Sequence, residues 1–268
     1  MSNFWKRTLT GIIFVVSIVG GLWLHPLIYM IIFAIVVFLG MYEFIRIVEG
    51  ADTRVRVFWS MALGMFVYLS SFFMFYADFH PRWFVVMVPL VGGVFLSELY
   101  LRNKNSLLNI ATTLIVPLYV ALPFAFLHHM AFFGGSYGFE LLLGFFVLIW
   151  TNDSGAYLVG NILGRRKLFP SVSPAKSWEG AIGGFFITLL VAIANYHFLG
   201  VVRLIDWLVI GGLVAVLGTY GDLIESMLKR SVNVKDSGNV LPGHGGVLDR
   251  FDAVFFSAPA VSCYLLFC

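Results

Sequence analysis

Long apolar runs recur from one end of this 268-residue sequence to the other, and they decide what the chain can fold into. Runs of about 18 or more apolar residues can cross a bilayer as helices, because one crossing needs about 20 residues. Charged residues make up 12% of the chain, whereas soluble domains contain about 25%. The sequence therefore predicts an all-α polytopic integral membrane protein.

About nine transmembrane helices can be drawn, and they leave no stretch long enough for a separate water-soluble domain. The two longest polar connections between them are 161–179 and 226–252. We predict an N-terminal transmembrane scaffold over 1–130 and a C-terminal catalytic region over 131–268 that carries both connections. The predicted spans are 8–24, 27–45, 57–77, 83–100, 107–127, 140–160, 180–199, 205–225 and 253–267.

The basic residues give these spans an orientation. With the N-terminus inside, the inner segments contain all 17 Lys and Arg residues except Arg82 and Arg203. Such a bias follows the positive-inside rule, by which Lys and Arg stay in cytoplasmic connections. We therefore expect a cytoplasmic N-terminus and a C-terminus on the outer side.

Acidic residues at the ends of the later spans are candidates for function. A charged side chain at mid-bilayer costs at least ~2.5 kcal/mol, so such residues are rarely there without a role. Asp153 lies near the end of one span, Asp222 near the end of another, and Asp249 and Asp252 begin the last. We expect all four on the cytoplasmic side.

Asp222 and Asp249 are the candidate metal ligands. A hairpin-like return between their two spans brings the carboxylates toward each other. Together with phosphate oxygens and water they suit Mg²⁺, which takes few protein ligands and prefers oxygen. The alternative is that each acid pairs with a nearby base, Asp249 with Arg230 and Asp222 with Lys229.

The connection "KDSGNVLPGHGGVLDRFD" combines glycines with charged residues. Gly243, Gly245 and Gly246 allow φ > 0 and close approach of an anion, and successive N–H groups there can form an anion-binding concavity. His244 adds a further donor. Four bases around it favour phosphate binding, although the positive-inside rule alone also explains bases here. These bases are Lys229, Arg230, Lys235 and Arg250.

The connection "GRRKLFPSVSPAKSWEG" is the second polar segment. Ser173 followed by Pro174 predicts a helix start, and so does Ser177 ahead of Glu179. A helix N-terminus directed at the cytoplasmic face favours an anionic ligand. The basic cluster 165–167 is equally suited to lipid head groups.

The run "SMLKRSVNVKDSGNVLPGHGGVLDRFD" resembles the signature of the phosphatidate cytidylyltransferases (CDP-diacylglycerol synthases). The segments "NDSGAYLVGNILGRRKL" and "SPAKSWEG" are similar to upstream motifs of that family, with Ser177 where threonine is more usual. Every fixed position of the signature is present: Ser226, Lys229, Arg230, Lys235, Asp236, His244, Gly245, Gly246, Asp249, Arg250 and Asp252.

The resemblance implies transfer of CMP from CTP to phosphatidate, giving CDP-diacylglycerol and pyrophosphate, in a Mg²⁺-dependent homodimer. It implies a multi-pass protein of the bacterial inner membrane, with a cytoplasmic active site and no nucleic-acid partner. By the same resemblance Asp222 and Asp249 bind the metal. The implied phosphate contacts are Lys229, Arg230, Lys235, His244 and Arg250, and the implied substrate-binding residues are Lys176, Ser177, Gly245, Gly246, Asp153, Asp236 and Asp252.

Two other functions compete with this interpretation. One is a membrane enzyme that uses CTP on an isoprenoid or ether-lipid phosphate, because the loops do not report the lipid chain. The other is a transporter of anions, which also places ionisable residues within spans. A transporter needs charges along both halves of its pathway, whereas the outer side holds only Asp78, Arg82, Glu140, Arg203 and Asp206.

Overall fold

The computed structural model describes residues 3–50, 53–101, 104–238 and 245–268, with side chains from residue 11 onward. It forms two compact units. The first consists of Met1–Tyr137 with Asp236–Arg250, and the second of Gly138–Lys235 with Phe251–Cys268. The described residues 236–238 and 245–250 thus belong to the same unit as the N-terminal helices. The division into a scaffold and a catalytic region stays a prediction.

The polytopic helical architecture is confirmed. Among the described residues, seven helical segments are long and apolar enough to cross a membrane, and they coincide with seven of the predicted spans to within a few residues. The predicted span 8–24 lies in α1 (Asn3–Leu24), and the predicted span 253–267 overlaps α10 (Leu248–Leu265) except for its last two residues. Nine crossings and the orientation stay predictions. The seven are Pro26–Val48, Val57–Tyr76, Pro81–Leu101, Ser106–Ala131, Glu140–Leu163, Trp178–Leu199 and Leu204–Ser231.

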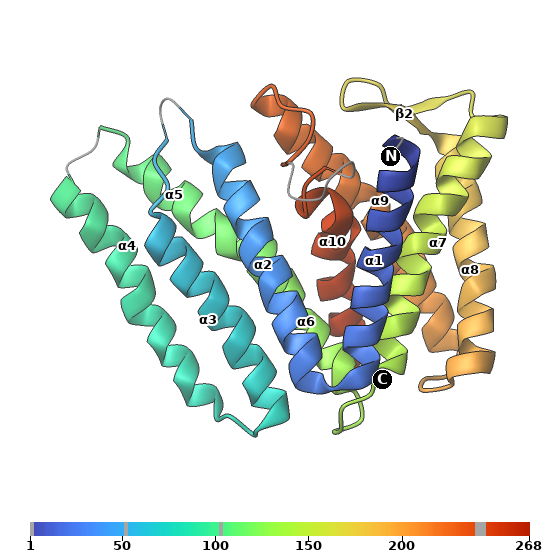
Figure 1. Ribbon diagram of the computed structural model, residues 1–268, viewed down its shortest axis with the longest axis horizontal. Helices are drawn as coiled ribbons and strands as arrows, with labels where there is room; N and C mark the ends of the chain where they lie inside the picture. Colours follow the sequence, from blue (N-terminus) through green and yellow to red (C-terminus); the bar gives the residue numbers. More distant parts are fainter. Residues whose placement is uncertain (1–2, 51–52, 102–103, 239–244) are drawn as a thin grey trace. The chain divides into compact units, whose positions relative to one another are not determined.

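In the first unit, α2 (Pro26–Val48), α3 (Val57–Tyr76) and α4 (Met87–Leu101) lie side by side (Figure 1). The short 3₁₀ helix η1 (Pro81–Val86) leads into α4. The next crossing is interrupted, because the π-helical turn η2 (Pro117–Ala121) separates α5 (Ser106–Val116) from α6 (Leu122–Ala131). Pro117 has no N–H to continue the α-helical ladder, which accounts for a bulge at this point.

Aromatic side chains fill the core of the first unit. Tyr29, Phe72 and His128 are fully buried there, and their rings lie within 6.4 Å of one another between centroids. A buried polar group needs a partner, and the Tyr29 hydroxyl is hydrogen-bonded to Nδ1 of His128 at 2.9 Å. The Tyr68 hydroxyl donates to the carbonyl of Met30 at 3.1 Å. The polar atoms in this core therefore fix how the helices align.

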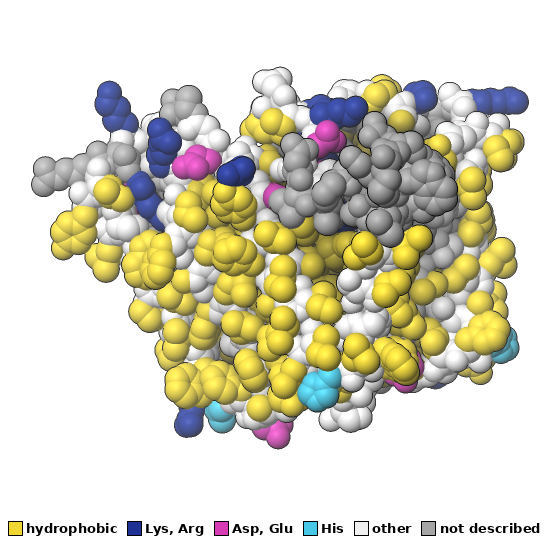
Figure 2. Space-filling model, in the orientation of Figure 1, with side chains coloured by type: hydrophobic (Ala, Val, Ile, Leu, Met, Phe, Trp, Pro, Cys, Tyr) yellow, Lys and Arg dark blue, Asp and Glu magenta, His cyan; other side chains and the backbone are white. Residues whose placement is uncertain are grey.

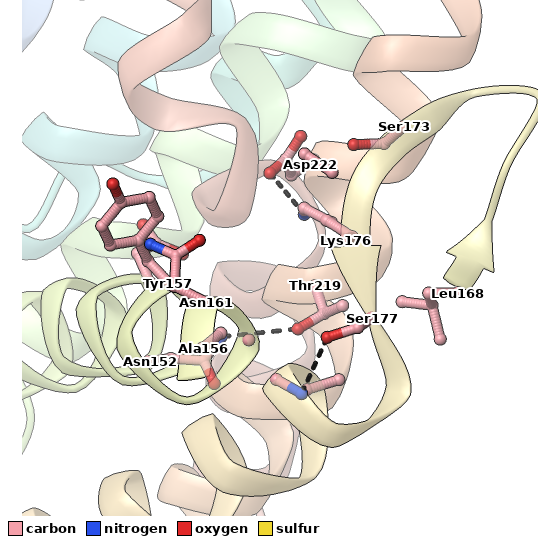
Figure 3. A pocket seen from close by; sticks show the side chains of 15 residues that line it. Asn152, Ala156, Tyr157, Asn161, Leu168, Ser173, Lys176, Ser177, Thr219 and Asp222 are labelled. Atoms are coloured by element: carbon pink, nitrogen blue, oxygen red, sulfur yellow. Dashed lines mark hydrogen bonds and ion pairs between the residues drawn. The ribbon is translucent and has the colours of Figure 1, made fainter. Parts of the chain in front are cut away.

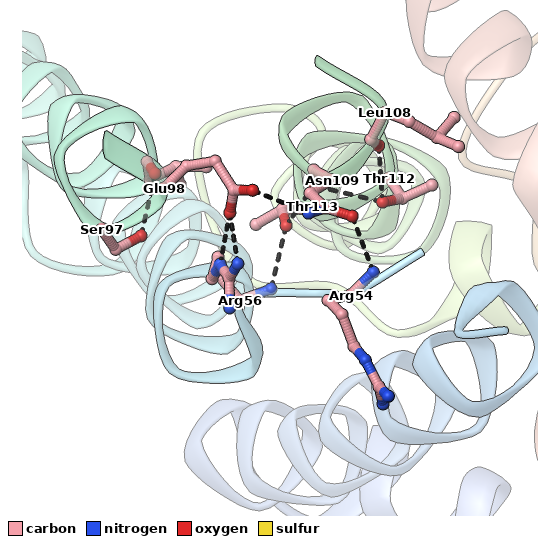
Figure 4. Close-up of polar contacts among 9 residues, drawn as sticks. Arg54, Arg56, Ser97, Glu98, Leu108, Asn109, Thr112 and Thr113 are labelled. Carbon is pink, nitrogen blue, oxygen red and sulfur yellow. Dashed lines mark hydrogen bonds and ion pairs between the residues drawn. The ribbon is translucent and has the colours of Figure 1, made fainter. Parts of the chain in front are cut away.

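A buried polar network joins α3, α4 and α5 at one end of the first unit (Figure 4). The guanidinium of Arg56 pairs with Glu98, whose side chain is 2% exposed. Asn109 donates to the other oxygen of Glu98 at 2.7 Å, and the Arg56 amide donates to Thr113 at 3.0 Å. The charge of Glu98 is thus neutralised inside the helix bundle.

The outer surface of α2 and α3 is apolar. Figure 2 shows hydrophobic side chains over these helices, with Lys and Arg gathered at one end. On α2 the exposed large residues include Ile31, Ile35 and Phe38. An apolar band bordered by basic residues is typical of a lipid-facing surface.

In the second unit, α7 (Glu140–Leu163), α8 (Trp178–Leu199) and α9 (Leu204–Ser231) run alongside one another (Figure 1). Glycines line the contact between α7 and α8. A Cβ on Gly155 would lie 3.3 Å from the Cα of Gly184, and one on Gly160 would lie 3.5 Å from the Cα of Gly180. Small residues let transmembrane helices approach closely and so supply the packing energy that the lipid does not.

A two-stranded antiparallel hairpin, β1 (Lys167–Phe169) and β2 (Ser173–Ser177), is added to the helical fold. The predicted helix start at Ser173–Pro174 is wrong. A residue before proline is pushed toward extended backbone, and Ser173 pairs with Phe169 in the hairpin. The predicted start at Ser177 is confirmed, because α8 begins at Trp178 and the Ser177 hydroxyl accepts the Gly180 amide at 3.2 Å.

Candidate functional site

A polar cavity of about 320 Å³ lies in the second unit, between α7, α9 and the hairpin strand β2 (Figure 3). Most of its polar side chains come from segments that the sequence singled out. The polar lining residues are Asn152, Asp153, Tyr157 and Asn161 of α7, Ser173, Lys176 and Ser177 of β2, and Thr219 and Asp222 of α9.

An ion pair between Lys176 and Asp222 crosses this cavity (Figure 3). The side chains are 28% and 32% exposed, so solvent and small solutes reach both. The Ser226 hydroxyl donates to the other oxygen of Asp222 at 3.3 Å. The pair offers an ammonium to an anion and a carboxylate to a cation within a single cavity.

The N-terminus of α8 borders the same cavity. Ser177 caps it, and Gly180 and Ala181 of its first turn line the cavity wall. The carboxylate of Glu179 accepts the amide N–H of Arg165 at 3.0 Å and that of Arg166 at 3.2 Å. These bonds tie the end of the α7–β1 connection to α8. The partial positive charge of a helix N-terminus favours negative charge nearby.

Four carboxylates of the second unit interact electrostatically. Asp252, at the start of α10, is repelled by Asp222, Glu225 and Asp153. Lys229 offsets part of this charge by pairing with Glu225 at 3.3 Å. An excess of carboxylates is the donor chemistry that a hard divalent cation requires.

Mg²⁺ is the cation that the sequence predicts, and carboxylate oxygens are the type of ligand that it prefers. Among the described residues, no three or more His, Cys, Asp or Glu side chains are grouped for metal binding. Mg²⁺ needs fewer, because it is usually held by one or two carboxylates with substrate oxygens and water. Asp222 belongs to the second unit and Asp249 to the first, and their shared metal site stays a prediction.

The described part of the glycine-rich connection lies in the first unit. Oδ2 of Asp249 accepts the amide N–H of Gly246 at 2.8 Å and that of Ser237 at 3.2 Å. Gly245 has φ +81°, as expected for a glycine in this connection, and a Cβ there would lie 2.6 Å from the same oxygen. Asp249 thus shapes this turn, while the substrate roles of both glycines stay predictions.

The remaining predicted contacts differ in exposure. Lys229 is 9% exposed, and the exposed Arg230 donates to the carbonyl of Val234 at 3.1 Å. His244 and Gly243 lie outside the described residues. Lys235, Asp236 and Arg250 are exposed, so they are accessible to a soluble ligand.

Three residues near the site were not predicted from sequence. Asn152 donates to the Thr219 hydroxyl at 3.4 Å across the cavity. Glu225 takes part in the carboxylate group and lies one helical turn after Asp222. Thr219 precedes Asp222 by one helical turn and Asn152 precedes Asp153, so their spacing to the predicted acids was the available signal.

An apolar groove of about 400 Å³ adjoins the polar cavity in the second unit. The two share Leu168, Ala181 and Thr219 as lining residues. The other residues that line the groove are almost all hydrophobic: Phe169, Trp178, Ile182, Phe185, Phe186, Ala215, Val216, Tyr220 and Leu223. A charged ligand group and an apolar chain can therefore occupy neighbouring sites.

Comparison with known proteins decides the family. The model of the cytidylyltransferase family matches residues 5–268. The chain belongs to the cytidylyltransferase family. This match confirms the resemblance to the family that the signature indicated. Membership of the family also indicates that the protein is a transferase.

Individual relatives carry a more specific name, phosphatidate cytidylyltransferase. One from Haemophilus influenzae is 31% identical over 98% of both chains. One from Staphylococcus aureus is 39% identical, with the match spanning 62% of this chain and 62% of the relative. One from Staphylococcus saprophyticus is 34% identical over 68% of this chain and 75% of the relative.

Proposed function

We propose that this member of the cytidylyltransferase family transfers CMP from CTP to phosphatidate, releasing pyrophosphate and forming CDP-diacylglycerol. The observation that carries the proposal is the polar cavity with its Lys176–Asp222 pair beside an apolar groove. One substrate of this reaction is a soluble polyanion and the other has a phosphate head and acyl chains. The relatives named for this reaction support the same substrates.

The phosphates belong in the polar cavity in this proposal. Lys176 and the first turn of α8 provide positive charge there. The amides of Asn152 and Asn161 and the ring of Tyr157 line the same cavity and offer hydrogen bonds and an aromatic face to the base. The exposed side chains of Lys235, Arg230 and Arg250 supply further cations for the triphosphate.

The acyl chains belong in the apolar groove. Trp178, Ile182 and Phe186 on α8 are large hydrophobic residues that line this groove, and each is between 50% and 61% exposed. Such a surface is as apolar as the surrounding lipid, so acyl chains can lie against it without leaving an apolar environment. The shared residue Leu168 marks where the head group would meet the glycerol backbone.

The chemical step needs positioning and charge neutralisation more than a base. A phosphate oxygen of phosphatidate, already ionised near pH 7, attacks the α-phosphorus of CTP in line, and the bond to pyrophosphate breaks. Repulsion between two anions is the obstacle, so cationic side chains and oriented backbone dipoles lower the barrier. We assign Lys176, Lys229, Arg230, Lys235, His244 and Arg250 to this task.

Asp222 and Asp249 are the carboxylates that would hold Mg²⁺, which when bound supplies positive charge to the nucleotide phosphates. Asp153 and Asp222 both interact electrostatically with Asp252, so these carboxyl groups would offer further oxygen atoms beside the metal. Asp236, Ser177, Gly245 and Gly246 would complete the substrate contacts. We also propose a homodimer in the bacterial inner membrane, with the site on the cytoplasmic side.

Purified protein in mixed micelles tests the proposal with α-labelled CTP. Phosphatidate with Mg²⁺ should give labelled CDP-diacylglycerol, and EDTA should abolish the product. Product formed only with a polyprenyl phosphate would assign another lipid. Anion flux in liposomes without nucleotide turnover would assign transport instead.

A pair of lysines from the two hairpin strands makes the test specific to the cavity. Lys176→Ala should lower turnover at least about 100-fold, because it removes a cation next to developing charge. Lys167→Ala, from the exposed strand β1, should keep nearly full turnover. Equal activity of the two variants would exclude the cavity as the reaction site.

A further inference from the structure

Glu43 is a buried carboxylate for which the proposed reaction has no assigned role. It lies in α2, within a segment apolar enough to span a membrane, and its side chain is 2% exposed. In the described part of the chain, no Lys or Arg pairs with it. A carboxylate buried without a counter-ion is costly unless hydrogen bonds stabilise it.

The hydrogen bonds of Glu43 come from the glycine-rich connection. Its Oε2 accepts the amide N–H of Leu248 at 3.0 Å and the hydroxyl of Ser237 at 3.2 Å. Leu248 is the first residue of α10. Glu43 therefore caps α10 from a distant part of the sequence and places negative charge at its N-terminus, where the helix dipole favours it.

Two glycines of the same connection make room for this carboxylate. A Cβ on Gly238 would lie 2.7 Å from Oε1 of Glu43, and a Cβ on Gly246 would lie 2.5 Å from Oε2. Real Cβ atoms do not approach so closely, so a side chain at either position would displace Glu43. The glycines are therefore needed to make room for a protein carboxylate.

The hydrogen bonds from Ser237 and Leu248 to Glu43 fix residues on either side of the undescribed residues 239–244. Close to these two residues lie Asp236, Asp249 and Arg250, which the proposed function assigns to the substrate, the metal and the phosphates respectively. We infer that Glu43 is a positioning residue: its bonds to Ser237 and Leu248 orient the neighbouring side chains of Asp236, Asp249 and Arg250. This inference rests on the proposed cytidylyl transfer for its effect on rate but not for its effect on structure.

The two oxygens of Glu43 allow its charge to be separated from its hydrogen bonds. Among the residues that the structure describes, Oε1 has no hydrogen-bond partner, whereas Oε2 accepts both bonds. A glutamine can keep a carbonyl oxygen at the Oε2 position and turn its NH₂ toward Oε1. Glu43→Gln should therefore preserve the anchor, while Glu43→Ala should remove it.

Kinetics of CMP transfer test the role. Glu43→Ala should lower kcat at least about tenfold, since removing a hydrogen-bonded anchor misplaces groups that act on the transition state. Glu43→Gln should stay within about threefold of the wild type. If Glu43→Ala is not obtained folded, Glu43→Asp replaces it, because a side chain shorter by one methylene cannot reach Leu248, and the same loss is expected.

Glu98 provides the matched control, since it is an equally buried carboxylate of the same unit that bonds to Arg56 and Asn109 instead. Glu98→Ala should lower thermal stability but, below its melting temperature, leave kcat per folded protein within about twofold. Wild-type kcat for Glu43→Ala, or a Glu43→Gln variant as impaired as Glu43→Ala, would overturn the inference.

Hydrogen–deuterium exchange separates this inference from the proposed reaction. Peptides covering 245–250 should exchange at least about tenfold faster in Glu43→Ala than in the wild type or in Glu98→Ala. That result would support the anchor even if the wild type transferred no CMP. Unchanged exchange in Glu43→Ala would refute it whatever the enzyme's activity.

Discussion

At the scale of single residues, most charged groups of the candidate site have a partner of opposite charge or a backbone donor. Lys176 pairs with Asp222 and Lys229 with Glu225, while Asp249 accepts two backbone amides. The partly exposed Lys176–Asp222 pair contributes little stability, about 0–1 kcal/mol. The pair instead holds the ammonium and the carboxylate at fixed positions until a substrate or a cation binds to them.

A substitution at Asp249 can separate the effect of its charge from the effect of its hydrogen bonds. Asn at this position retains a carbonyl oxygen that can accept the Gly246 and Ser237 amides. We therefore expect Asp249→Asn to fold with a melting temperature close to the wild type but to lose at least about 100-fold in pyrophosphate release, because a neutral amide binds Mg²⁺ poorly. Thermal unfolding in detergent and a lipid-dependent pyrophosphate assay measure the two effects. Full turnover by this variant would remove Asp249 from the metal site.

At the scale of elements, glycines decide how α7 and α8 bring the cavity residues together. A Cβ on Gly184 would lie 3.0 Å from the carbonyl oxygen of Asn152, in the turn that also carries Asp153. The hairpin β1–β2 then places Lys176 against α9. Side-chain positions in the cavity thus depend on how closely the helix backbones pack.

Gly184→Ala should separate α7 from α8. We expect a loss of about 1–3 kcal/mol of stability, because inserting atoms into a packed contact forces backbone shifts, and a lower rate of CMP transfer. Gly212→Ala is the control, since a Cβ there would meet nothing closer than Phe185 at 3.8 Å. Thermal unfolding of both variants in the same detergent measures the difference. Equal melting temperatures would mean that close packing at Gly184 is unimportant.

At the scale of the whole molecule, the distribution of charge predicts an orientation. The exposed Ser171 lies in the connection 161–179 that carries part of the site, and the exposed Ser136 lies between the predicted spans 107–127 and 140–160. The positive-inside rule puts the first on the cytoplasmic side and the second outside.

Single cysteines at these positions test the orientation after Cys263 and Cys268, both exposed, are replaced by serine. In intact spheroplasts a membrane-impermeant maleimide should label Ser136→Cys but not Ser171→Cys. Permeabilised cells should label both, which controls for reactivity. Labelling of Ser171→Cys in intact cells would place the candidate site on the outer side and refute the proposed access of CTP from the cytoplasm.

The sequence by itself determined the helical membrane architecture and the family. Hydropathy depends only on the local sequence, so it predicts membrane spans without knowledge of tertiary contacts. The signature around Asp249 has many fixed polar positions, so it identifies the family. Local signals failed at Ser173–Pro174, where a proline suits either a helix start or an extended strand. The extended form is adopted because Ser173 pairs with Phe169 of the neighbouring strand.

Only the tertiary structure decided which groups meet. The pairing of Asp222 with Lys176 and the bonds from Glu43 to Ser237 and Leu248 join residues far apart in the chain. No pattern along one helix specifies such contacts, because they depend on the packing and register of several helices at once. Nothing along the sequence connects Glu43 with the family's signature, whereas in the fold it bonds to Ser237 and Leu248, which lie within that signature.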